Sequence, residues 1–253
     1  MPLIDRDTVR IHYETRGQGP VILLSHGYSA TAQMWRGQHE ALSQAHTLVT
    51  WDMRGHGQSD SPDDPAAYSA QATIDDMAAI LDAVGAERAI IGGLSLGGYF
   101  SLMFHATYPE RVRALLILDT GPGYRKDEAR NGWNQQALQT AERFEQGGMA
   151  RVQAMKESTT GGTHRSAQGL AHAARGMLAQ RDATVIESLP GIRVPSLILV
   201  GADDTPFLQS AEVMAAKIPG AQKVVIPGAG HVANIDQPQA FNAAVSAFLA
   251  GLD

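Results

Sequence analysis

Residues 89–100 read A-I-I-G-G-L-S-L-G-G-Y-F, so that one serine, Ser95, has a pair of glycines close to it on each side. A short apolar run precedes the first pair, and an apolar segment of helical character follows the second. A chain that turns sharply from a strand into a helix strains the turn residue, and the neighbours two positions away must be very small to avoid collisions between Cβ atoms. The pattern therefore predicts a nucleophile elbow, with the Ser95 hydroxyl raised above a sheet.

The glycines around Ser95 do not fit a phosphate-binding loop. No G-K-[ST] follows them, and their spacing is not G-x-G-x-x-G. An ordinary glycine-rich turn is also compatible with a pattern as short as G-x-S-x-G. A serine hydroxyl becomes a good nucleophile only when a base takes its proton, and a carboxylate usually orients that base. The interpretation of Ser95 therefore depends on a base and an acid elsewhere in the chain.

The composition of the chain restricts its partners. The 253 residues, 44% of them apolar and 18% charged, are typical of a globular protein. The formal net charge of -6 argues against nucleic acid, and the absence of cysteine excludes disulfides and a cysteine nucleophile. The charged N-terminal residues lack the apolar core of a signal peptide, and no apolar run approaches the roughly 20 residues that span a bilayer. We therefore expect a cytoplasmic protein with no membrane or nucleic-acid partner.

Short apolar runs separated by helical patterns define the predicted fold class. Residues Thr8–Thr15 alternate between apolar and polar side chains, which is the period of a half-exposed strand. Apolar residues at helical spacing predict helices over 71–84 and 238–250. Strands that alternate with helices form a mostly parallel sheet with helices on both faces, which is an α/β fold. The nearly continuous apolar runs that predict buried strands are Val21–Ser25, Leu48–Trp51, Ala89–Gly92, Leu115–Asp119, Ser196–Val200 and Lys223–Ile226.

One region interrupts this alternation. Between about residues 124 and 189 the sequence has no buried-strand pattern, and helix-like pieces are separated there by pairs of glycines. We expect a helical cap inserted between two strands of the sheet, so that residues 1–120 and 191–253 form the core and residues 121–190 the cap. The apolar residues of this cap, with its adaptable methionines, would form one wall of a pocket.

An acidic pair and a histidine follow the last two predicted strands. Asp203 and Asp204 come directly after the strand Ser196–Val200 and its glycine, and His231 follows the strand Lys223–Ile226 in the sequence P-G-A-G-H. The carboxyl ends of parallel strands meet at one edge of the sheet, where open α/β folds bind ligands. A serine, then an acid, then a histidine is the chain order of an α/β-hydrolase triad.

Five segments of the chain together resemble the α/β-hydrolase superfamily, in the order that this family shows. The resemblance implies an α/β-hydrolase fold with a mostly parallel eight-stranded sheet, helices on both faces and a small helical cap. It also implies catalysis by a Ser-His-Asp triad without a metal or an organic cofactor. The segments are V-I-L-L-S-H-G (21–27), W-D-M-R-G-H-G-Q-S-D (51–60), G-L-S-L-G-G (93–98), L-V-G-A-D-D (199–204) and G-A-G-H (228–231).

The resemblance implies a role for each catalytic residue. Ser95 would be the nucleophile, and His231 would be the general base and then the general acid. The catalytic acid of the family commonly lies three residues after the strand-end glycine, at Asp204. The backbone amides of Leu96 and Tyr28 would form the oxyanion hole, because each can donate to the negative charge that develops on the substrate oxygen.

Alternatives to these roles remain open. Asp203 is adjacent to the preferred acid, and Asp119, at the end of an earlier strand, is a further candidate. His26 is a rival base, although the resemblance places it as a structural histidine in the oxyanion loop. The charged residues within 52–59 belong to a loop that is structural in the family. Tyr28 is expected mainly as an aromatic lining residue, with its hydroxyl as a second possible contact for substrate.

The sequence also suggests residues that contact substrate. Trp35, Trp133 and Met155 are the candidates for the pocket lining, although a position in the core suits the two tryptophans equally well. The elbow and the compact cap resemble those of small bacterial carboxylesterases and enol-lactonases. The expected activity is therefore hydrolysis of a small carboxylic ester or lactone through an acyl-enzyme, by a monomer or small homo-oligomer.

Two other functions are compatible with the same residues. One is a carbon–carbon bond hydrolase or a lyase that acts on an anionic substrate, such as a ring-cleavage product. The other is a ligand-sensing protein with little turnover, against which the complete triad argues. A serine at the elbow argues against haloalkane dehalogenases and epoxide hydrolases, because these relatives carry an aspartate at that position.

Overall fold

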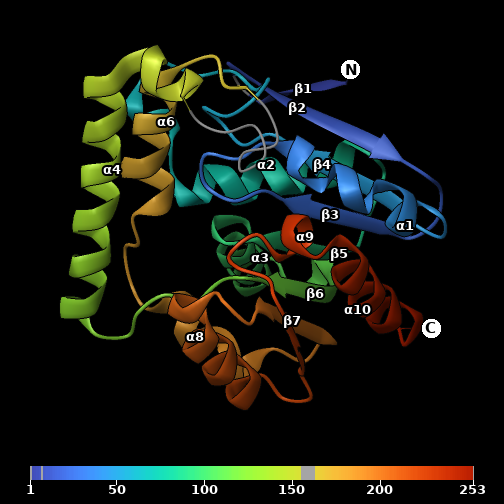
Figure 1. Ribbon diagram of the computed structural model, residues 1–253. Helices are drawn as coiled ribbons and strands as arrows, with labels where there is room; N and C mark the ends of the chain where they lie inside the picture. The colour runs from blue at the N-terminus through green and yellow to red at the C-terminus, as the bar shows by residue number, and fades with distance from the viewer. Residues whose placement is uncertain (1, 7, 155–162, 253) are drawn as a thin grey trace.

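The computed structural model describes residues 2–6, 8–154 and 163–252, and one eight-stranded sheet forms its centre (Figure 1). The strand order is β1-β2-β4-β3-β5-β6-β7-β8. The first two strands pair antiparallel with each other and β2 pairs antiparallel with β4, whereas the remaining pairs are parallel. The strands are β1 (Leu3–Arg6), β2 (Val9–Arg16), β3 (Val21–Ser25), β4 (Thr47–Trp51), β5 (Ala89–Leu94), β6 (Val112–Leu118), β7 (Ser196–Gly201) and β8 (Gln222–Ile226).

This sheet confirms the predicted fold class. It adds one strand, β1, that the sequence pattern did not predict, and it corrects the predicted burial of another, β8. The edge strand β1 has only four residues and escaped the pattern, because a short exposed strand shows no apolar run. The apolar run Lys223–Ile226 predicted a strand buried on both faces. In the structure β8 lies at the other edge, where most of its residues are exposed or half-buried and Val225 is 41% exposed.

Helices cover both faces of the sheet, and each face has its own apolar core. Along β3, Leu23 points into the core beneath α2 and α3, while Ile22 and Leu24 point into the core beneath α1 and α10. The predicted helices 71–84 and 238–250 correspond closely to α2 and α10. The α-helices outside the insertion described next are α1 (His39–Ser43), α2 (Ala70–Ala83), α3 (Leu96–Thr107), α8 (Thr205–Lys217), α9 (Ala233–Asp236) and α10 (Pro238–Ala250), and the short η helices are η1 (Ala32–Gln38), η2 (Pro65–Ala67), η3 (Pro109–Arg111) and η5 (Leu189–Gly191).

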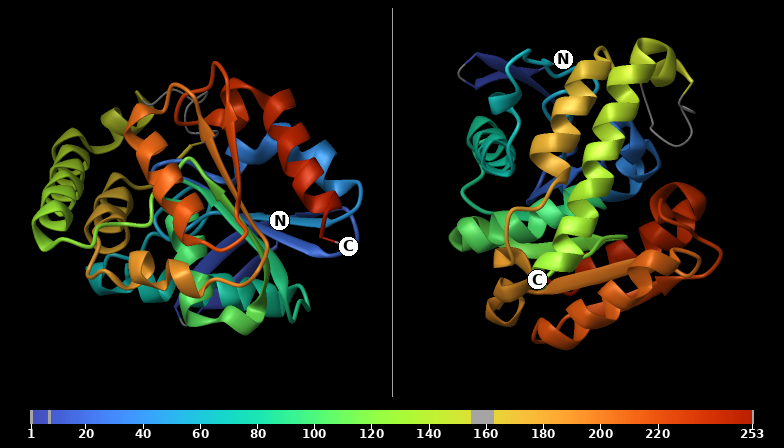
Figure 2. Two further views of the ribbon diagram at one scale, coloured as in Figure 1. Left: turned by 90° about the horizontal axis from the view of Figure 1, so that it is seen from below. Right: turned by 90° about the vertical axis from the view of Figure 1, so that its left-hand side faces the viewer.

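The chain between β6 and β7 forms a helical insertion, which we call the cap. In it α4 and α6 lie side by side at one side of the molecule, as both views show (Figures 1 and 2). The cap has a small apolar core of its own, in which Phe144 of α4 and Leu170 of α6 are buried. Gly148 breaks α4 with a φ of 52°, and it is the second residue of a glycine pair at 147–148 that the sequence marked as an interruption. Its helices are α4 (Asp127–Gln153), α6 (Ala167–Ala173), η4 (Ala174–Leu178) and α7 (Thr184–Ser188).

Candidate active site

The turn between β5 and α3 explains the glycines around Ser95. Ser95 has φ 56° and ψ −114°, a conformation that L side chains rarely adopt. A Cβ on Gly93 would lie 2.5 Å from the carbonyl carbon of Gly97, and a Cβ on Gly97 would lie 2.2 Å from the carbonyl oxygen of Ser25. A side chain at either position would therefore push the helix away from the sheet and unfold the turn.

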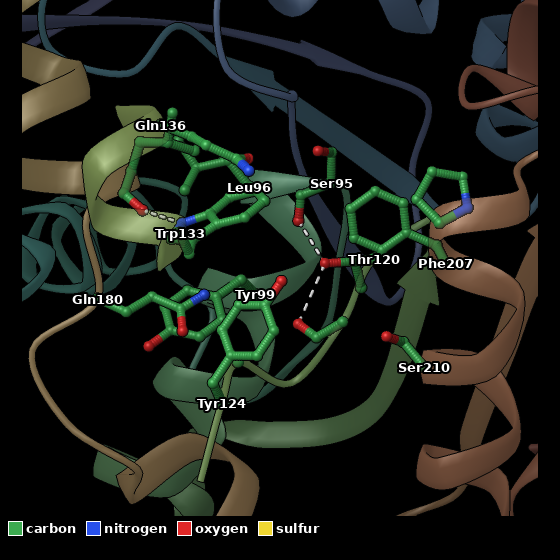
Figure 3. Close-up of a pocket in the computed structure, with 14 residues that line it drawn as sticks. Ser95, Leu96, Tyr99, Thr120, Tyr124, Trp133, Gln136, Gln180, Phe207 and Ser210 are labelled. Carbon is green, nitrogen blue, oxygen red and sulfur yellow. Dashed lines mark hydrogen bonds between the residues drawn. The ribbon is translucent and has the colours of Figure 1, made fainter. Parts of the chain in front are cut away.

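Hydrogen bonds hold this strained turn in place. The Ser95 amide donates to the carbonyl oxygen of Leu118 at 3.0 Å. The Ser95 carbonyl accepts from the Tyr99 amide at 3.0 Å and from the Thr120 hydroxyl at 2.6 Å (Figure 3). The backbone of Ser95 is thus fixed from β6 and from α3, and its side chain lines a pocket.

Asp204 and His231 meet at the carboxyl edge of the sheet. Nδ1 of His231 lies 2.8 Å from Oδ2 of Asp204, which is only 4% exposed. The His231 ring also stacks on Phe207, with ring centroids 4.9 Å apart. Asp203 is exposed, and its amide donates to the Ala229 carbonyl. Of the two adjacent carboxylates, the structure therefore brings only Asp204 to the histidine.

Asp119 has a different set of partners. It is fully buried with φ 42°, and its carboxylate accepts from the Gly201 amide at 2.7 Å and from the Ala233 amide at 3.3 Å. Burial, reinforced by the negative charge of Asp204, raises the pKa of Asp119 to about 7. Asp119 thus ties the end of β7 to the start of α9, the segment that follows His231.

The expected oxyanion donors come from two segments that both lie close to the nucleophile. Leu96 is the first residue of α3, so its amide has no acceptor within the helix and lies at the positive end of the helix dipole. The loop that holds Tyr28 passes close to Ser95, since a Cβ on Gly27 would lie 3.5 Å from the Ser95 Cβ. This arrangement supports the proposed use of both amides.

The Tyr28 side chain faces the cap. Its hydroxyl donates to the Leu170 carbonyl of α6 at 2.8 Å, and its ring packs edge-on against Phe144 and His56. Burial raises the pKa of this hydroxyl, which stays protonated as a donor. The side chain therefore joins the oxyanion loop to the cap, and its hydroxyl is already engaged.

His26 has a structural role in the same loop. Its Nε2 accepts from the Met53 amide at 3.0 Å, and its Nδ1 faces the Gly27 carbonyl at 2.7 Å, so the neutral ring uses both nitrogens. Burial lowers the pKa of His26 to about 4. The position agrees with the structural role that the resemblance implied.

The neighbouring loop 52–59 is also structural. The buried carboxylate of Asp52 accepts from the amides of Ala32 and Gln58, at 2.7 and 2.9 Å. Arg54 forms a bidentate pair with the buried Asp76, with N–O distances of 2.6 and 2.8 Å. Asp52 is thus held by amides of its own surroundings and Arg54 by Asp76, and none of these charged residues lines the pocket above Ser95.

A cavity of about 230 Å³ lies between Ser95, the cap and α8. In Figure 3, Trp133, Gln136 and Gln180 lie on the cap side of this pocket, and Phe207 and Ser210 lie on the α8 side. The lining residues among those described are Ser95, Leu96, Tyr99, Thr120, Gly121, Gly123, Tyr124, Trp133, Gln136, Leu178, Gln180, Pro206, Phe207 and Ser210.

The three residues proposed for substrate contact have three different outcomes. Trp133 lines the pocket, and its indole N–H donates to the Leu178 carbonyl at 2.8 Å. Trp35 is fully buried in the core beneath α10, where it packs against Phe241, so it does not contribute to the lining. Met155 lies outside the described residues.

Sequence reasoning missed several lining residues. Tyr99 lies one helical turn after Ser95 on α3, and Phe207 lies one turn into the helix that follows Asp204, so helical spacing from the two catalytic candidates was the available signal. Tyr124, Gln136 and Gln180 gave no such signal, because the packing of the cap over the sheet decides which of its residues face the pocket.

Within residues 2–6, 8–154 and 163–252, no group of three or more His, Cys, Asp or Glu side chains is arranged to hold a metal ion. In the same residues, every helix is too short or too polar to span a bilayer.

The chain belongs to the alpha/beta hydrolase family, whose model matches residues 21–244. It is 30% identical to 3-oxoadipate enol-lactonase 1 of Acinetobacter baylyi over 96% of this chain and 93% of that protein. It is 26% identical, over 96% of both chains, to a Bacillus subtilis protein to which a 2-succinyl-6-hydroxy-2,4-cyclohexadiene-1-carboxylate synthase activity is provisionally assigned. Among solved structures, a thermophilic esterase of Thermogutta terrifontis is similar with a TM-score of 0.83 and 30% identity, over 96% of this chain and 94% of the esterase.

Proposed function

We propose that this protein is a serine hydrolase that cleaves a small carboxylic ester or lactone through an acyl-enzyme. The observation that supports the proposal is that Ser95 and Phe207, the residue on which His231 stacks, line the same pocket. The strained turn presents Ser95 to the cavity, and the buried Asp204 orients His231, whose ring stacks on the lining residue Phe207.

The proposed reaction has two halves. His231 takes the Ser95 proton through Nε2, since Nδ1 faces Asp204, and the serine oxygen attacks the ester carbonyl. The amides of Leu96 and Tyr28 stabilise the oxyanion, and its collapse expels the alcohol, which leaves with the proton from His231. Water then attacks the acyl-enzyme with His231 as the base again, which releases the acid and restores Ser95.

The relatives support hydrolysis as the reaction class. An esterase and an enol-lactonase are each 30% identical to this chain over nearly its whole length, and both names describe cleavage of a carboxylic ester bond, which in a lactone is closed into a ring. The carboxylate in the name of the Bacillus relative indicates an anionic compound. No charged side chain occurs among the described lining residues, which favours an uncharged ester or lactone over such an anion and over the carboxylate that the name of the 3-oxoadipate enol-lactonase also indicates.

The test compares wild type with Ser95→Ala on p-nitrophenyl esters from acetate to octanoate. We expect turnover by the wild type, with an optimum at short acyl chains, and loss of that turnover in the variant. Labelling of Ser95 by a fluorophosphonate probe measures activation of the serine separately from substrate choice. A folded wild type that is neither labelled nor active would refute the proposal and would favour a ligand-sensing role.

A further inference from the structure

The described lining of the pocket above Ser95 is mostly apolar, and it contains polar side chains but no charged one. None of the lining residues among those described is Asp, Glu, Lys, Arg or His. A substrate with an obligatory charge would lose its hydration there and gain no partner of opposite charge. Among uncharged substrates, a polar side chain of this lining can select for a hydrogen-bonding group.

Gln180 differs from the other polar lining residues in its hydrogen bonding. Its side-chain oxygen Oε1 is buried and has no donor within hydrogen-bond distance in the described structure, and the residue as a whole is only 9% exposed. Most buried acceptors have a donor, because an unpaired one loses its hydration without compensation. An unpaired buried oxygen in the wall of a substrate pocket is thus placed to receive a donor from a ligand.

The backbone of Gln180 is fixed by one side chain of the cap. The Gln180 amide donates to Oδ1 of Asn134 at 2.8 Å, and Nδ2 of Asn134 donates to the Gln180 carbonyl at 2.8 Å. The neighbouring Trp133 binds the Leu178 carbonyl from the same helix. The segment 178–180 therefore cannot shift along α4 without losing three hydrogen bonds.

The side-chain oxygen of Gln180 lies very close to the backbone of Gly123. Gly123 has φ 83°, and a Cβ there would lie 2.7 Å from Gln180 Oε1 and 3.2 Å from the Tyr99 ring. Only glycine leaves this room. Figure 3 shows the Gln180 side chain in the region of Tyr99 and Tyr124, on the cap side of the pocket that Ser95 lines.

We propose that Gln180 is a specificity-determining residue whose Oε1 accepts a hydrogen bond from an O–H or N–H group of an uncharged ester or lactone. This inference rests on the proposed hydrolase function and narrows its substrate class. A site that pairs with a substrate donor rejects an analogue without the donor much more strongly than an apolar pocket rejects a change of one methyl group, because the buried acceptor is left unpaired.

The experiment uses three pairs of esters that differ only in the donor. N-acetylglycine ethyl ester and ethyl levulinate differ by N–H against CH₂ on the acyl side. Ethyl β-hydroxybutyrate and ethyl isovalerate differ by O–H against CH₃ on the acyl side. The acetate of 1,2-propanediol esterified at its primary hydroxyl and isobutyl acetate differ in the same way on the alcohol side. The kcat/KM of each ester is measured for wild type, Gln180→Met and Gln136→Met.

We expect wild type to prefer the donor-bearing member of at least one pair by about tenfold or more in kcat/KM. Gln180→Met keeps the length of the side chain and removes the acceptor, so this preference should fall to about threefold or less, through slower turnover of the donor-bearing ester. Gln136→Met removes an exposed glutamine from the same wall and should keep the wild-type preference. Equal turnover within all three pairs, or an unchanged preference in Gln180→Met, would overturn the inference.

A binding measurement decides the inference independently of catalysis. In a Ser95→Ala background the Kd of each ester is measured by titration calorimetry, with and without Gln180→Met. Tighter binding of a donor-bearing ester that disappears with Gln180→Met supports the role of Gln180 even if no ester is hydrolysed, in which case only the proposed hydrolase function fails. Equal Kd values within every pair overturn the inference, whatever the hydrolytic activity.

Discussion

Oδ2 of Asp204 lies 2.8 Å from Nδ1 of His231, and the two residues differ greatly in exposure. The Asp204 side chain is 4% exposed, whereas that of His231 is 41% exposed. A buried carboxylate holds the ring of an exposed histidine in one orientation and leaves Nε2, on the far side of the ring, available for proton transfer. This geometry supports the proposed orienting role of Asp204.

Asp204→Asn should lower kcat strongly, because an amide favours the wrong histidine tautomer and cannot stabilise the protonated ring. The corresponding loss in serine proteases is about 10⁴-fold, so we expect a loss of about 10²–10⁴-fold here. The matched control is Asp203→Asn, one position away on the exposed side of the turn, which should change kcat by about threefold or less. Both are measured on the most reactive p-nitrophenyl ester across pH.

The outcome of this comparison also decides between the alternative acids. A larger loss in Asp203→Asn would contradict the role of Asp204. Mild effects of both variants would direct attention to Asp119, whose buried carboxylate binds the amides of Gly201 and Ala233.

The strained backbone of Ser95 leads to a prediction about the melting temperature of variants at this position. At φ 56° and ψ −114° a side chain is strained, at a cost of about 1–3 kcal/mol, and glycine relieves that strain. Ser95→Gly should therefore raise the Tm above that of Ser95→Ala by about 2–4 °C for each kcal/mol relieved. Both variants should be inactive. A lower Tm in Ser95→Gly would show that the surrounding hydrogen bonds impose no such strain.

Tyr28→Phe separates the two contributions of residue 28, which are the proposed oxyanion contact of its backbone amide and the hydrogen bond of its hydroxyl to the cap. The change removes the hydrogen bond from the hydroxyl to the Leu170 carbonyl and leaves the backbone amide of residue 28 in place. Loss of this bond should cost about 1 kcal/mol of the free energy of unfolding. We expect kcat/KM to fall by about threefold or less. A loss above about a hundredfold with unchanged stability would instead place the hydroxyl in contact with the substrate.

The sequence predicted those parts of the site that depend on local constraints. Gly93 and Gly97 mark the elbow because a Cβ at either would collide with backbone, a requirement that any chain with this turn must meet. Asp204 and His231 follow strand ends, and a parallel sheet brings strand ends to one edge. These features need only short stretches of sequence and the order of elements.

The pocket wall could not be predicted in the same way. Trp35 and Trp133 are the same residue type, yet one is fully buried against Phe241 and the other lines the cavity. Which of them contacts substrate depends on how the cap packs on the sheet. No sequence pattern distinguishes Gln180. Its buried, unpaired side-chain oxygen results from the folded arrangement of the cap, in which Asn134 holds the backbone of Gln180.

Three buried histidines should make the fold sensitive to acid. His26 and His56 have ring centroids 5.0 Å apart, and His56 and His164 are 5.6 Å apart. His56 accepts from the Ser29 amide, and His164 accepts from the Gly57 amide and faces the Ser29 carbonyl, so the group joins the oxyanion loop to the cap. Burial lowers the pKa of all three, although the carboxylate of Asp52 opposes this shift for His26 and His164.

The sign of the effect follows from the lowered pKa values. The unfolded chain protonates these histidines near pH 6.5, whereas the folded protein leaves His26 neutral down to about pH 4. The contribution of His26 to stability is therefore fully present above pH 6.5 and is lost as the pH falls toward 4. The contributions of His56 and His164 are lost in the same direction, because their pKa values are also lowered. Asp119 acts in the opposite direction, because its raised pKa of about 7 lets the folded state take up a proton first.

His164→Gln isolates the contribution of one histidine, because glutamine can keep both an acceptor and a donor but does not titrate. The free energy of unfolding is measured by urea denaturation at several pH values below neutrality. Its slope against pH should become shallower in the variant by up to about 1.4 kcal/mol per pH unit, the value for one proton. An unchanged slope would mean that His164 takes up its proton equally in the folded and unfolded chain, in contradiction of its buried, neutral hydrogen bonding.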